Sequence, residues 1–316
     1  MTETLRTLGR RNILSISGGK DSTAMWLLAT EQGINALPVF ADTGHEHPLT
    51  YDYLDYLESK LGKLRRVRAD FTQDFAERRD YISREWTKEG VAPEQIGRAL
   101  AALVPTGIPF LDLCMLKGRF PSTRVRFCSE ILKRDVIFND VFIPTMDAGY
   151  QVISWQGIRR DESEARRGAL ERETIAPRLE FYRPLIHWSA ADVFAMHKKH
   201  DIDPNPLYKL GMGRVGCMPC IHAGRDEIIE IAKRFPEEVA RVERWEAIVS
   251  ECSKHGVSVL MDVRVGRAAD LDEIKAHTHG IRNYIDWART ARGGKIYNLA
   301  SIEAPAACAS QYGLCE

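Results

Sequence analysis

The residues best suited to chemistry form the segment from Ser17 to Ser22, which reads Ser-Gly-Gly-Lys-Asp-Ser. Its glycines allow backbone N–H groups to approach an anion closely, and Lys20 adds a compact positive charge. The spacing matches neither the GxxxxGK[ST] nor the GxGxxG pattern. A helix beginning here would add its positive N-terminal dipole. The segment therefore predicts a phosphate-binding loop whose nucleotide-binding residues are Ser17, Gly18, Gly19, Lys20, Asp21 and Ser22.

Two more polar groups follow apolar runs further along the chain. Asp42 and Thr43 could contact a nucleotide or help hold Mg²⁺, although an aspartate here could also be a helix cap.

The second group is Arg159 and Arg160, which follow the apolar run 152–155. Arginine is suited to bidentate phosphate binding, and departing pyrophosphate needs charge compensation. Alternatively, these two arginines belong to a solvated helix face on which glutamates are their ion-pair partners. We assign phosphate binding or catalysis to Lys20, Asp21, Gly157, Arg159 and Arg160.

Cysteine chemistry is indicated by the pair Cys217 and Cys220, which are spaced as CxxC. Such a pair can be redox-active, bind zinc or bind an iron–sulfur cluster. His45 and His47 could ligate a metal by their spacing, but two histidines alone are a weak metal signal, so we interpret them as loop residues. Cys252 is interpreted as an apolar core residue.

The elements that must position these groups alternate between strands and helices. Apolar runs predict strands, and helical stretches of crossover length lie between the first three of them. This alternation indicates a parallel sheet with helices on both faces. The predicted strands are 12–17, 36–41, 64–69 and 152–155.

Two parts of the chain do not follow this alternation. Residues from about 76 to 127 predict a helical insertion, and the chain from about 184 predicts a helical C-terminal part. Ser189 is an expected helix N-cap, and 227–252 is helical by periodicity. We expect a nucleotide-binding domain over 1–215 and a cysteine-containing helical region over 216–316.

The composition limits the remaining possibilities. The chain has 316 residues, and its 44 basic and 44 acidic side chains cancel, so overall charge gives no argument for nucleic acid. A local basic stretch over 117–134, with Phe120 and Phe127 interleaved, could contact a nucleic-acid backbone or be a solvated face. No apolar run is long enough to span a membrane and no secretory signal is visible, so we expect a cytoplasmic protein.

The motifs, taken in order, resemble those of PP-loop ATP pyrophosphatases, and within them the phosphoadenylyl-sulfate (PAPS) reductase family. The resemblance covers roughly residues 12–220 and rests on the first loop and on four later segments, which are 41–51, 157–163, 184–188 and 205–208. It implies a Rossmann-like, doubly wound α/β fold.

The intact first loop most resembles members that cleave ATP, in particular the ATP-pyrophosphatase subunit of DNA phosphorothioation systems. The resemblance implies that Mg·ATP adenylates an acceptor for sulfur transfer, with release of pyrophosphate. A nucleic-acid acceptor and a cysteine desulfurase or thioredoxin-like donor are implied partners. The alternatives are a sulfonucleotide reductase that forms sulfite and a non-catalytic nucleotide-binding redox sensor.

The resemblance also bears on the cysteines. Cluster-bearing reductases have a cysteine motif where Cys128 stands, followed by a later CxxC pair, which implies a [4Fe–4S] cluster; zinc is the alternative. The implied ligands are Cys128, Cys217 and Cys220, with Cys114 the nearest fourth and Cys308 or Cys315 as alternatives. Those reductases carry a nucleophilic cysteine on a C-terminal tail, so Cys315 is a candidate catalytic residue.

Overall fold

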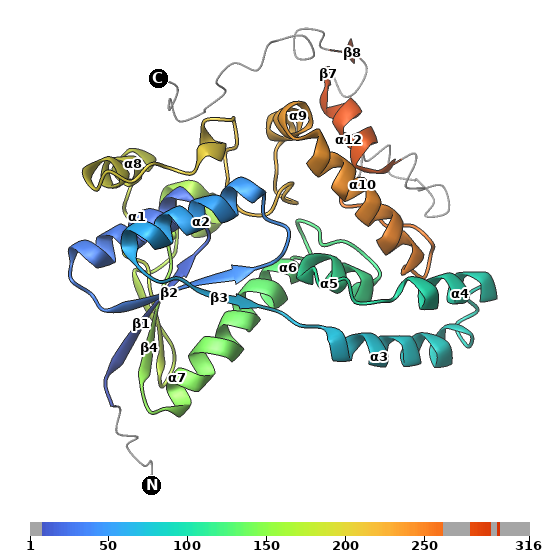
Figure 1. Ribbon diagram of the computed structural model, residues 1–316, viewed down its shortest axis with the longest axis horizontal. Coiled ribbons are helices and arrows are strands. Elements are labelled where there is room, and N and C mark those ends of the chain that lie inside the picture. The colour runs from blue at the N-terminus through green and yellow to red at the C-terminus, as the bar shows by residue number, and fades with distance from the viewer. Residues whose placement is uncertain (1–7, 262–278, 292–295, 298–316) are drawn as a thin grey trace.

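The computed structural model of the protein describes residues 8–261, 279–291 and 296–297. A six-stranded sheet forms its centre, in the order β3-β2-β1-β4-β6-β5. All neighbouring strands pair in parallel except β5, which is antiparallel to β6. The strands are β1 (Arg10–Ile16), β2 (Ala36–Asp42), β3 (Arg65–Arg68), β4 (Gln151–Trp155), β5 (Arg172–Ala176) and β6 (Leu179–Tyr182) (Figure 1).

The four predicted strands are confirmed, whereas β5 and β6 were not predicted. All five residues of β5 are exposed, and β6 has only Leu179 fully buried. Neither strand therefore carries the apolar run by which a buried parallel strand is recognised.

Helices cover both faces of the sheet, which confirms the doubly wound α/β arrangement. One face packs against α1 (Lys20–Glu31), α2 (Pro48–Leu61) and α8 (Ala190–Lys199), whose apolar residues share a core with Leu14, Phe40 and Ile153. The other face packs against a helical stretch over 127–147, through Val141 and Phe142 among others. That stretch consists of α6 (Phe127–Ser129), η2 (Glu130–Asp135), η3 (Phe138–Phe142) and α7 (Ile143–Asp147).

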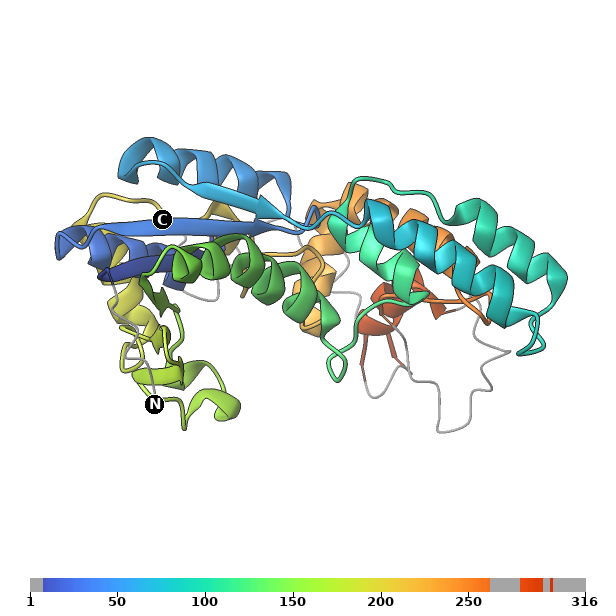
Figure 2. The same cartoon turned by 90° about the horizontal axis from the view of Figure 1, so that it is seen from below.

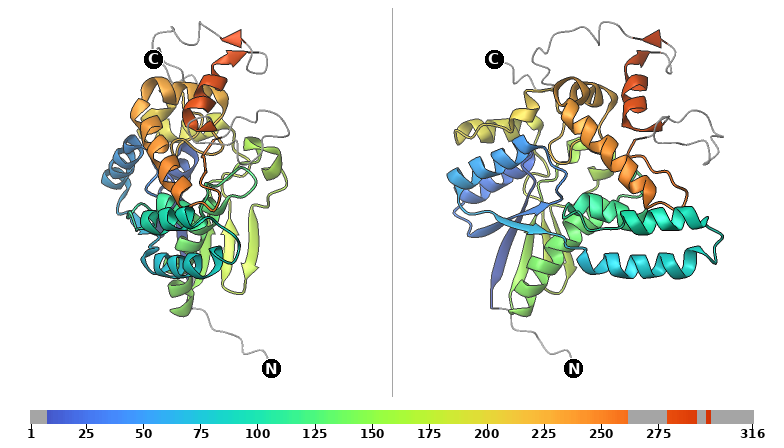
Figure 3. Two further views of the ribbon diagram at one scale, coloured as in Figure 1. Left: turned by 90° about the vertical axis from the view of Figure 1, so that its right-hand side faces the viewer. Right: turned by 45° about the vertical axis from the view of Figure 1, so that its right-hand side comes forward.

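The predicted helical insertion is present and packs away from the sheet. Its helices share one core with the C-terminal helices, in which Trp86, Phe110 and Trp245 are buried. Figures 2 and 3 show this second lobe beside the carboxyl ends of β2 and β3. The lobe contains α3 (Thr72–Tyr81), η1 (Ile82–Trp86), α4 (Pro93–Ala102), α5 (Pro109–Lys117), α9 (Arg225–Arg234), α10 (Pro236–Glu251) and α12 (Ile281–Ala288).

The shared core joins residues on both sides of position 215, so insertion and C-terminal helices form one packing unit. A domain boundary at 215/216 stays a prediction.

Local sequence explains where two helices end or begin. Ser189 and Asp192 form a reciprocal capping box that begins α8, as predicted for Ser189. The predicted helix over 227–252 is instead divided at Pro236, because proline has no N–H for an intrahelical bond and therefore begins α10.

The remaining elements are short. They are η4 (Arg160–Glu162), η5 (Glu164–Arg166), η6 (Pro206–Tyr208), β7 (Thr290–Ala291) and β8 (Ile296–Tyr297). Among all helices in the described ranges, none is long and apolar enough to cross a membrane.

Candidate functional site

The predicted phosphate loop connects β1 to α1. Gly18 has a φ of +72°, and a Cβ there would lie 3.0 Å from Thr50 Cγ2, so the turn requires glycine on two grounds. The Ser22 hydroxyl accepts the Ser17 N–H at 3.1 Å and donates to the Gly19 carbonyl at 3.0 Å. These bonds close the turn and set it at the N-terminus of α1, where an anion is favoured.

The C-terminal half of the chain holds this loop in place. The Lys20 N–H donates to the Tyr208 hydroxyl at 2.9 Å, and Asn205 Nδ2 donates to the Gly18 carbonyl at 3.2 Å. His197 Nε2 on α8 donates to the Lys20 carbonyl at 2.9 Å. The segment 205–208 therefore has a definite role: it supports the loop backbone. His197 was not predicted, because its sequence context marks only a helix.

Asp21 lies between the two principal positive charges of the site. Its carboxylate accepts from Lys20 Nζ at 2.6 Å and from Arg159 Nε at 2.6 Å. Arg159 also pairs with Asp161 at 2.6 Å and is only 4% exposed. A Cβ on Gly157 would lie 3.1 Å from the Asp21 carbonyl carbon, so glycine allows this close approach. The structure therefore brings Gly157 and Arg159 to the phosphate loop, and their part in nucleotide binding stays a prediction.

These groups line a cavity of about 990 Å³. Its size suits a nucleotide together with part of a second substrate. Several lining residues were not predicted as site residues, because nothing in their local sequence distinguishes them from solvated charges or packed side chains. Those residues are Arg126, Glu162, Arg166, Tyr208, Arg214, His222 and Glu227.

Four described residues that were predicted to bind the nucleotide or act in catalysis do not line this cavity. Gly18 shapes the turn of the phosphate loop but is not among the lining residues. Arg160 donates from Nε and Nη2 to the Ala169 carbonyl and so fixes its own loop. Asp42 accepts from the Gly44 N–H and the Tyr51 hydroxyl. Thr43 is buried and donates to Glu46 at 2.8 Å. The groups after β2 thus support a neighbouring region instead of meeting the phosphate loop.

That neighbouring region is the contact between the loop after β2 and the cysteine pair. Glu46 and Cys217 form an isolated β-bridge, and Cys217 Sγ donates to Glu46 Oε1 at 3.7 Å. His45 Nε2 donates to the Pro219 carbonyl at 3.0 Å, and Arg241 donates to His45 Nδ1 at 3.2 Å. We call these contacts the cysteine clamp.

The contacts of the clamp determine the protonation state of His45. Burial lowers the pKa of His45 to about 3, and the nearby Arg241 adds to this effect. His45 is therefore neutral, with its proton on Nε2. His47 is the N-cap of α2 and accepts the Leu49 N–H at 3.1 Å. Both histidines are loop-supporting residues, as interpreted from the sequence.

The four cysteines implied as metal ligands lie in one region. Cys114 is fully buried on α5 close enough to Cys128 for their charges to interact, and Cys128 interacts in the same way with Cys220. Burial raises the pKa of Cys217 to about 12, and Lys133 opposes this increase. The charge interaction with Cys217 is the largest influence on Lys133 and raises its pKa, and the interaction with Glu46 adds to the increase, which burial opposes.

No three His, Cys, Asp or Glu side chains in the described part of the chain are arranged to hold a metal ion. The region thus has the thiol chemistry of a metal site, with Cys114, Cys128, Cys217 and Cys220 all free, but not its ligand geometry. Cys308 and Cys315 lie outside the described residues.

The interleaved aromatics of the basic stretch do not stack on a ligand. Phe120 and Phe127 are each 6% exposed and belong to the core of the helical lobe. The surrounding helices bury both rings, so neither is available to stack on a base. Only Arg126 of this stretch lines the cavity.

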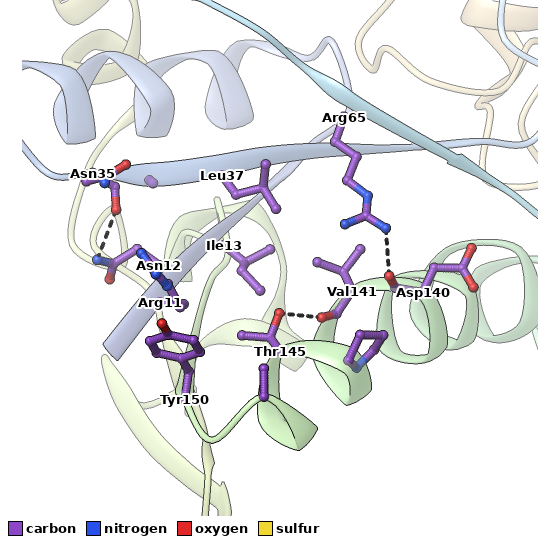
Figure 4. A pocket seen from close by; sticks show the side chains of 13 residues that line it. Arg11, Asn12, Ile13, Asn35, Leu37, Arg65, Asp140, Val141, Thr145 and Tyr150 are labelled. Atoms are coloured by element: carbon purple, nitrogen blue, oxygen red, sulfur yellow. Dashed lines mark hydrogen bonds between the residues drawn. The ribbon is translucent and has the colours of Figure 1, made fainter. Parts of the chain in front are cut away.

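A second cavity, of about 540 Å³, lies where β1, β2 and β3 begin (Figure 4). Arg11 stacks on Tyr150 at 4.3 Å, and Arg65 donates to the Asp140 carbonyl at 2.8 Å. Ligands of open α/β sheets bind instead beyond the carboxyl ends of the strands, where the phosphate loop is. The larger cavity is therefore the candidate site.

Comparisons with known proteins show the family to which the chain belongs. Residues 11–223 match the phosphoadenosine phosphosulfate reductase domain. An uncharacterized 37.8 kDa protein of Escherichia phage 186 is 48% identical, with 96% of each chain covered. The adenosine 5′-phosphosulfate reductase of Burkholderia cepacia is 35% identical over 103 residues, which cover 31% of this chain and 37% of that protein.

A solved phosphoadenylyl-sulfate reductase from Candida auris, in a phosphate complex, aligns with 66% of this chain and 81% of its own. The identity is 14% and the TM-score is 0.39. The match to the family domain extends from β1 to just beyond the cysteine pair and so includes the phosphate loop, the Arg159 loop and the cysteine pair, whereas Arg241 of the clamp lies beyond it. The chain belongs to the phosphoadenosine phosphosulfate reductase family.

Proposed function

We propose that this protein binds Mg·ATP and transfers its adenylyl group to an acceptor, releasing pyrophosphate, as the activating step of a sulfur transfer. One observation carries the proposal: the complete Ser-Gly-Gly-Lys-Asp-Ser loop opens onto the larger cavity together with Arg159. Reductases that do not cleave ATP resemble this fold but have a degraded first loop.

The ion pairs of the loop suggest how phosphate is received. Asp21 neutralises both Lys20 and Arg159 in the structure. In the proposed reaction, the β- and γ-phosphates take its place on these two cations. Asp21 is then free to help hold Mg²⁺, which supplies further charge neutralisation for the departing pyrophosphate. The chain contributes mainly position and charge stabilisation.

The cysteine region supports a second element of the proposal. We propose a thiolate-bound metal centre, a [4Fe–4S] cluster with zinc as the alternative, held by Cys128, Cys217 and Cys220 with Cys114 as the fourth ligand. The support is the gathering of the three free thiols of Cys128, Cys217 and Cys220 near Lys133, with the thiol of Cys114 near that of Cys128. Cys315 is proposed as the carrier of the transferred sulfur, with a cysteine desulfurase as donor.

A second candidate function is reduction of an adenylyl sulfate to sulfite. The similarity to the Burkholderia cepacia reductase favours it over about a third of the chain. The two functions differ in their products, because reduction yields sulfite and AMP without pyrophosphate.

The test is pyrophosphate release from Mg·ATP by anaerobically purified protein, with DNA, with tRNA and with neither. Pyrophosphate stimulated by one nucleic acid would support adenylation and identify the acceptor class. Sulfite from an adenylyl sulfate, with no pyrophosphate under any condition, would establish the reductase instead. A broad brown absorbance of the same sample would distinguish iron–sulfur from zinc.

A further inference from the structure

The larger cavity has charged residues that the proposed handling of ATP does not use. Arg126 comes from the loop before α6, and Arg214 precedes the cysteine pair. His222 and Glu227 follow that pair, and all four line the cavity together with Lys20. Three of them are basic or potentially basic, so the one carboxylate among them requires its own explanation.

The fold fixes the position of Glu227. It lies in the first turn of α9, two residues after the helix begins at Arg225. Ile228 and Ile231 on the same helix are each 1% exposed and packed in the core of the helical lobe. The helix is therefore anchored, and the carboxylate is presented to the cavity from a rigid element.

Glu227 differs from the other glutamate of its helix. Glu230 is paired with Lys233 and Arg234. Glu227 is partly buried, yet within the described ranges it has no hydrogen bond or ion pair. A partly buried carboxylate without a partner loses hydration that nothing in the protein replaces. A polar ligand bound in the cavity would supply such a partner.

The surroundings of Glu227 suit proton transfer. Burial raises the pKa of Glu227 to about 7, and the positive charge of Arg214 opposes this increase only in part. A group that titrates near neutral pH is an effective proton acceptor there. His222 is less suited, because its partial burial and the charges of Arg214 and Arg126 lower its pKa.

Of the other charged groups that line this space, the carboxylates of Asp21, Asp161 and Glu162 are already in ion pairs, and the rest are lysine and arginine cations. Burial and the charge of Arg214 lower the pKa of Arg166, which is paired with Glu162. Arg126 and Arg214 can attract an anionic substrate toward the cavity, but neither is suited to remove a proton at neutral pH.

We propose that Glu227 accepts the proton of the nucleophile that attacks ATP, and that the acceptor is therefore an uncharged group that loses a proton on reaction. A hydroxyl or a nucleobase lactam meets this requirement, whereas an ionised phosphate or sulfate has no proton to lose. The inference rests on the adenylation proposed above.

In the proposed step, the acceptor proton moves to a Glu227 carboxylate oxygen while the acceptor oxygen forms a bond to the α-phosphorus of ATP. The bond from that phosphorus to the oxygen bridging the β-phosphate breaks, and its electron pair leaves with pyrophosphate. Glu227 then returns its proton to solvent.

The experiment compares Glu227→Gln with the matched control Asp226→Asn in the full-length protein. Asp226 is adjacent on α9, exposed and not part of the cavity lining, so both changes remove one carboxylate from the same turn. Pyrophosphate release from Mg·ATP is measured with water alone, with bulk tRNA and with inorganic sulfate, across pH 5.5–8.5.

With water or tRNA, the wild-type kcat should fall below a pH of about 7. Glu227→Gln should lower kcat by about 100-fold or more and remove this acid limb, with KM for ATP changed less than about two-fold. Asp226→Asn should match the wild type in all three respects.

Two results would overturn the inference while leaving adenylation intact. One is a Glu227→Gln protein that keeps the wild-type kcat and acid limb. The other is pyrophosphate release that only sulfate supports, since that acceptor needs no proton acceptor. If the wild type releases no pyrophosphate with any probe, and Lys20→Ala behaves identically, then adenylation itself fails and this inference fails with it.

Discussion

The phosphate cavity and the cysteine clamp lie in one protein but satisfy their polar groups differently. In the cavity, Lys20 and Arg159 share the single carboxylate of Asp21, and all three border open space. In the clamp, Glu46 is 2% exposed and accepts hydrogen bonds from Thr43, Tyr51 and Cys217.

This difference has a physical consequence. Charges that compensate each other at a cavity can exchange their partners for those of a ligand. A buried carboxylate with several donors cannot be released without leaving those donors unsatisfied. Substitutions in the cavity should therefore change turnover while leaving stability nearly unchanged, and substitutions in the clamp should reduce stability first.

The largest expected effect is that of Lys20→Ala. Loss of a cation that stabilises departing pyrophosphate should lower the rate of pyrophosphate release by about 10²–10³-fold. Stability in urea should change little, because Asp21 keeps Arg159 as its partner. Lys198→Ala removes an exposed lysine on α8 and is the matched control. A Lys20→Ala protein that unfolds in the buffer used for the assay would break the comparison.

Arg159 and Arg160 provide the next test, because they are adjacent but differently placed. Arg159→Ala should lower pyrophosphate release by about 100-fold. Arg160→Ala should lower it less than about five-fold, because the Arg160 side chain donates to the Ala169 carbonyl and does not line the cavity. Steady-state kinetics at saturating ATP measure both. Equal losses in the two variants would show that the Arg159 loop acts as a unit.

The clamp should respond in the opposite way. Glu46→Ala leaves the Thr43 N–H and hydroxyl without their acceptor and should reduce the free energy of unfolding by about 2–3 kcal/mol. Urea denaturation measures this change, and Glu130→Ala, at an exposed position, is the control. Unchanged stability would mean that the clamp does not depend on its buried carboxylate.

The pH dependence of stability gives a further test of the clamp. The pKa of His45 is about 3 in the folded protein, against an ordinary value of 6.5, so the unfolded chain binds a proton first as pH falls. His45 should therefore reduce stability from about pH 6.5 downward, by up to about 1.4 kcal/mol per pH unit. His45→Gln should flatten this slope, and the exposed His255→Gln should not. Identical slopes would contradict the neutral state of His45.

The sequence predicted the cavity better than the clamp. The phosphate loop, Gly157 and Arg159 were correctly placed because each follows directly after a buried strand, and the carboxyl ends of parallel strands meet at one edge. The same rule placed Asp42 and Thr43 wrongly in the cavity, because the Glu46 carboxylate and the Tyr51 hydroxyl draw them into the clamp.

Contacts between distant segments could not be predicted. His197, Tyr208 and Glu227 reach the site only because the C-terminal half folds back over the loop. Arg160 follows Arg159 by one residue and has the same chemistry, so only the structure distinguishes the two. Cys315 and the C-terminal tail stay predictions.

The most direct test of the account is the fate of the γ-phosphate of ATP. Wild-type protein is incubated anaerobically with Mg²⁺, tRNA or DNA, and ATP labelled with ³²P at the γ position, and the products are separated by chromatography. Adenylation predicts labelled pyrophosphate together with an unlabelled adenylyl group, either attached to the acceptor or released from it as AMP. Label recovered only as orthophosphate, or ATP left intact while an adenylyl sulfate is converted to sulfite, would contradict it.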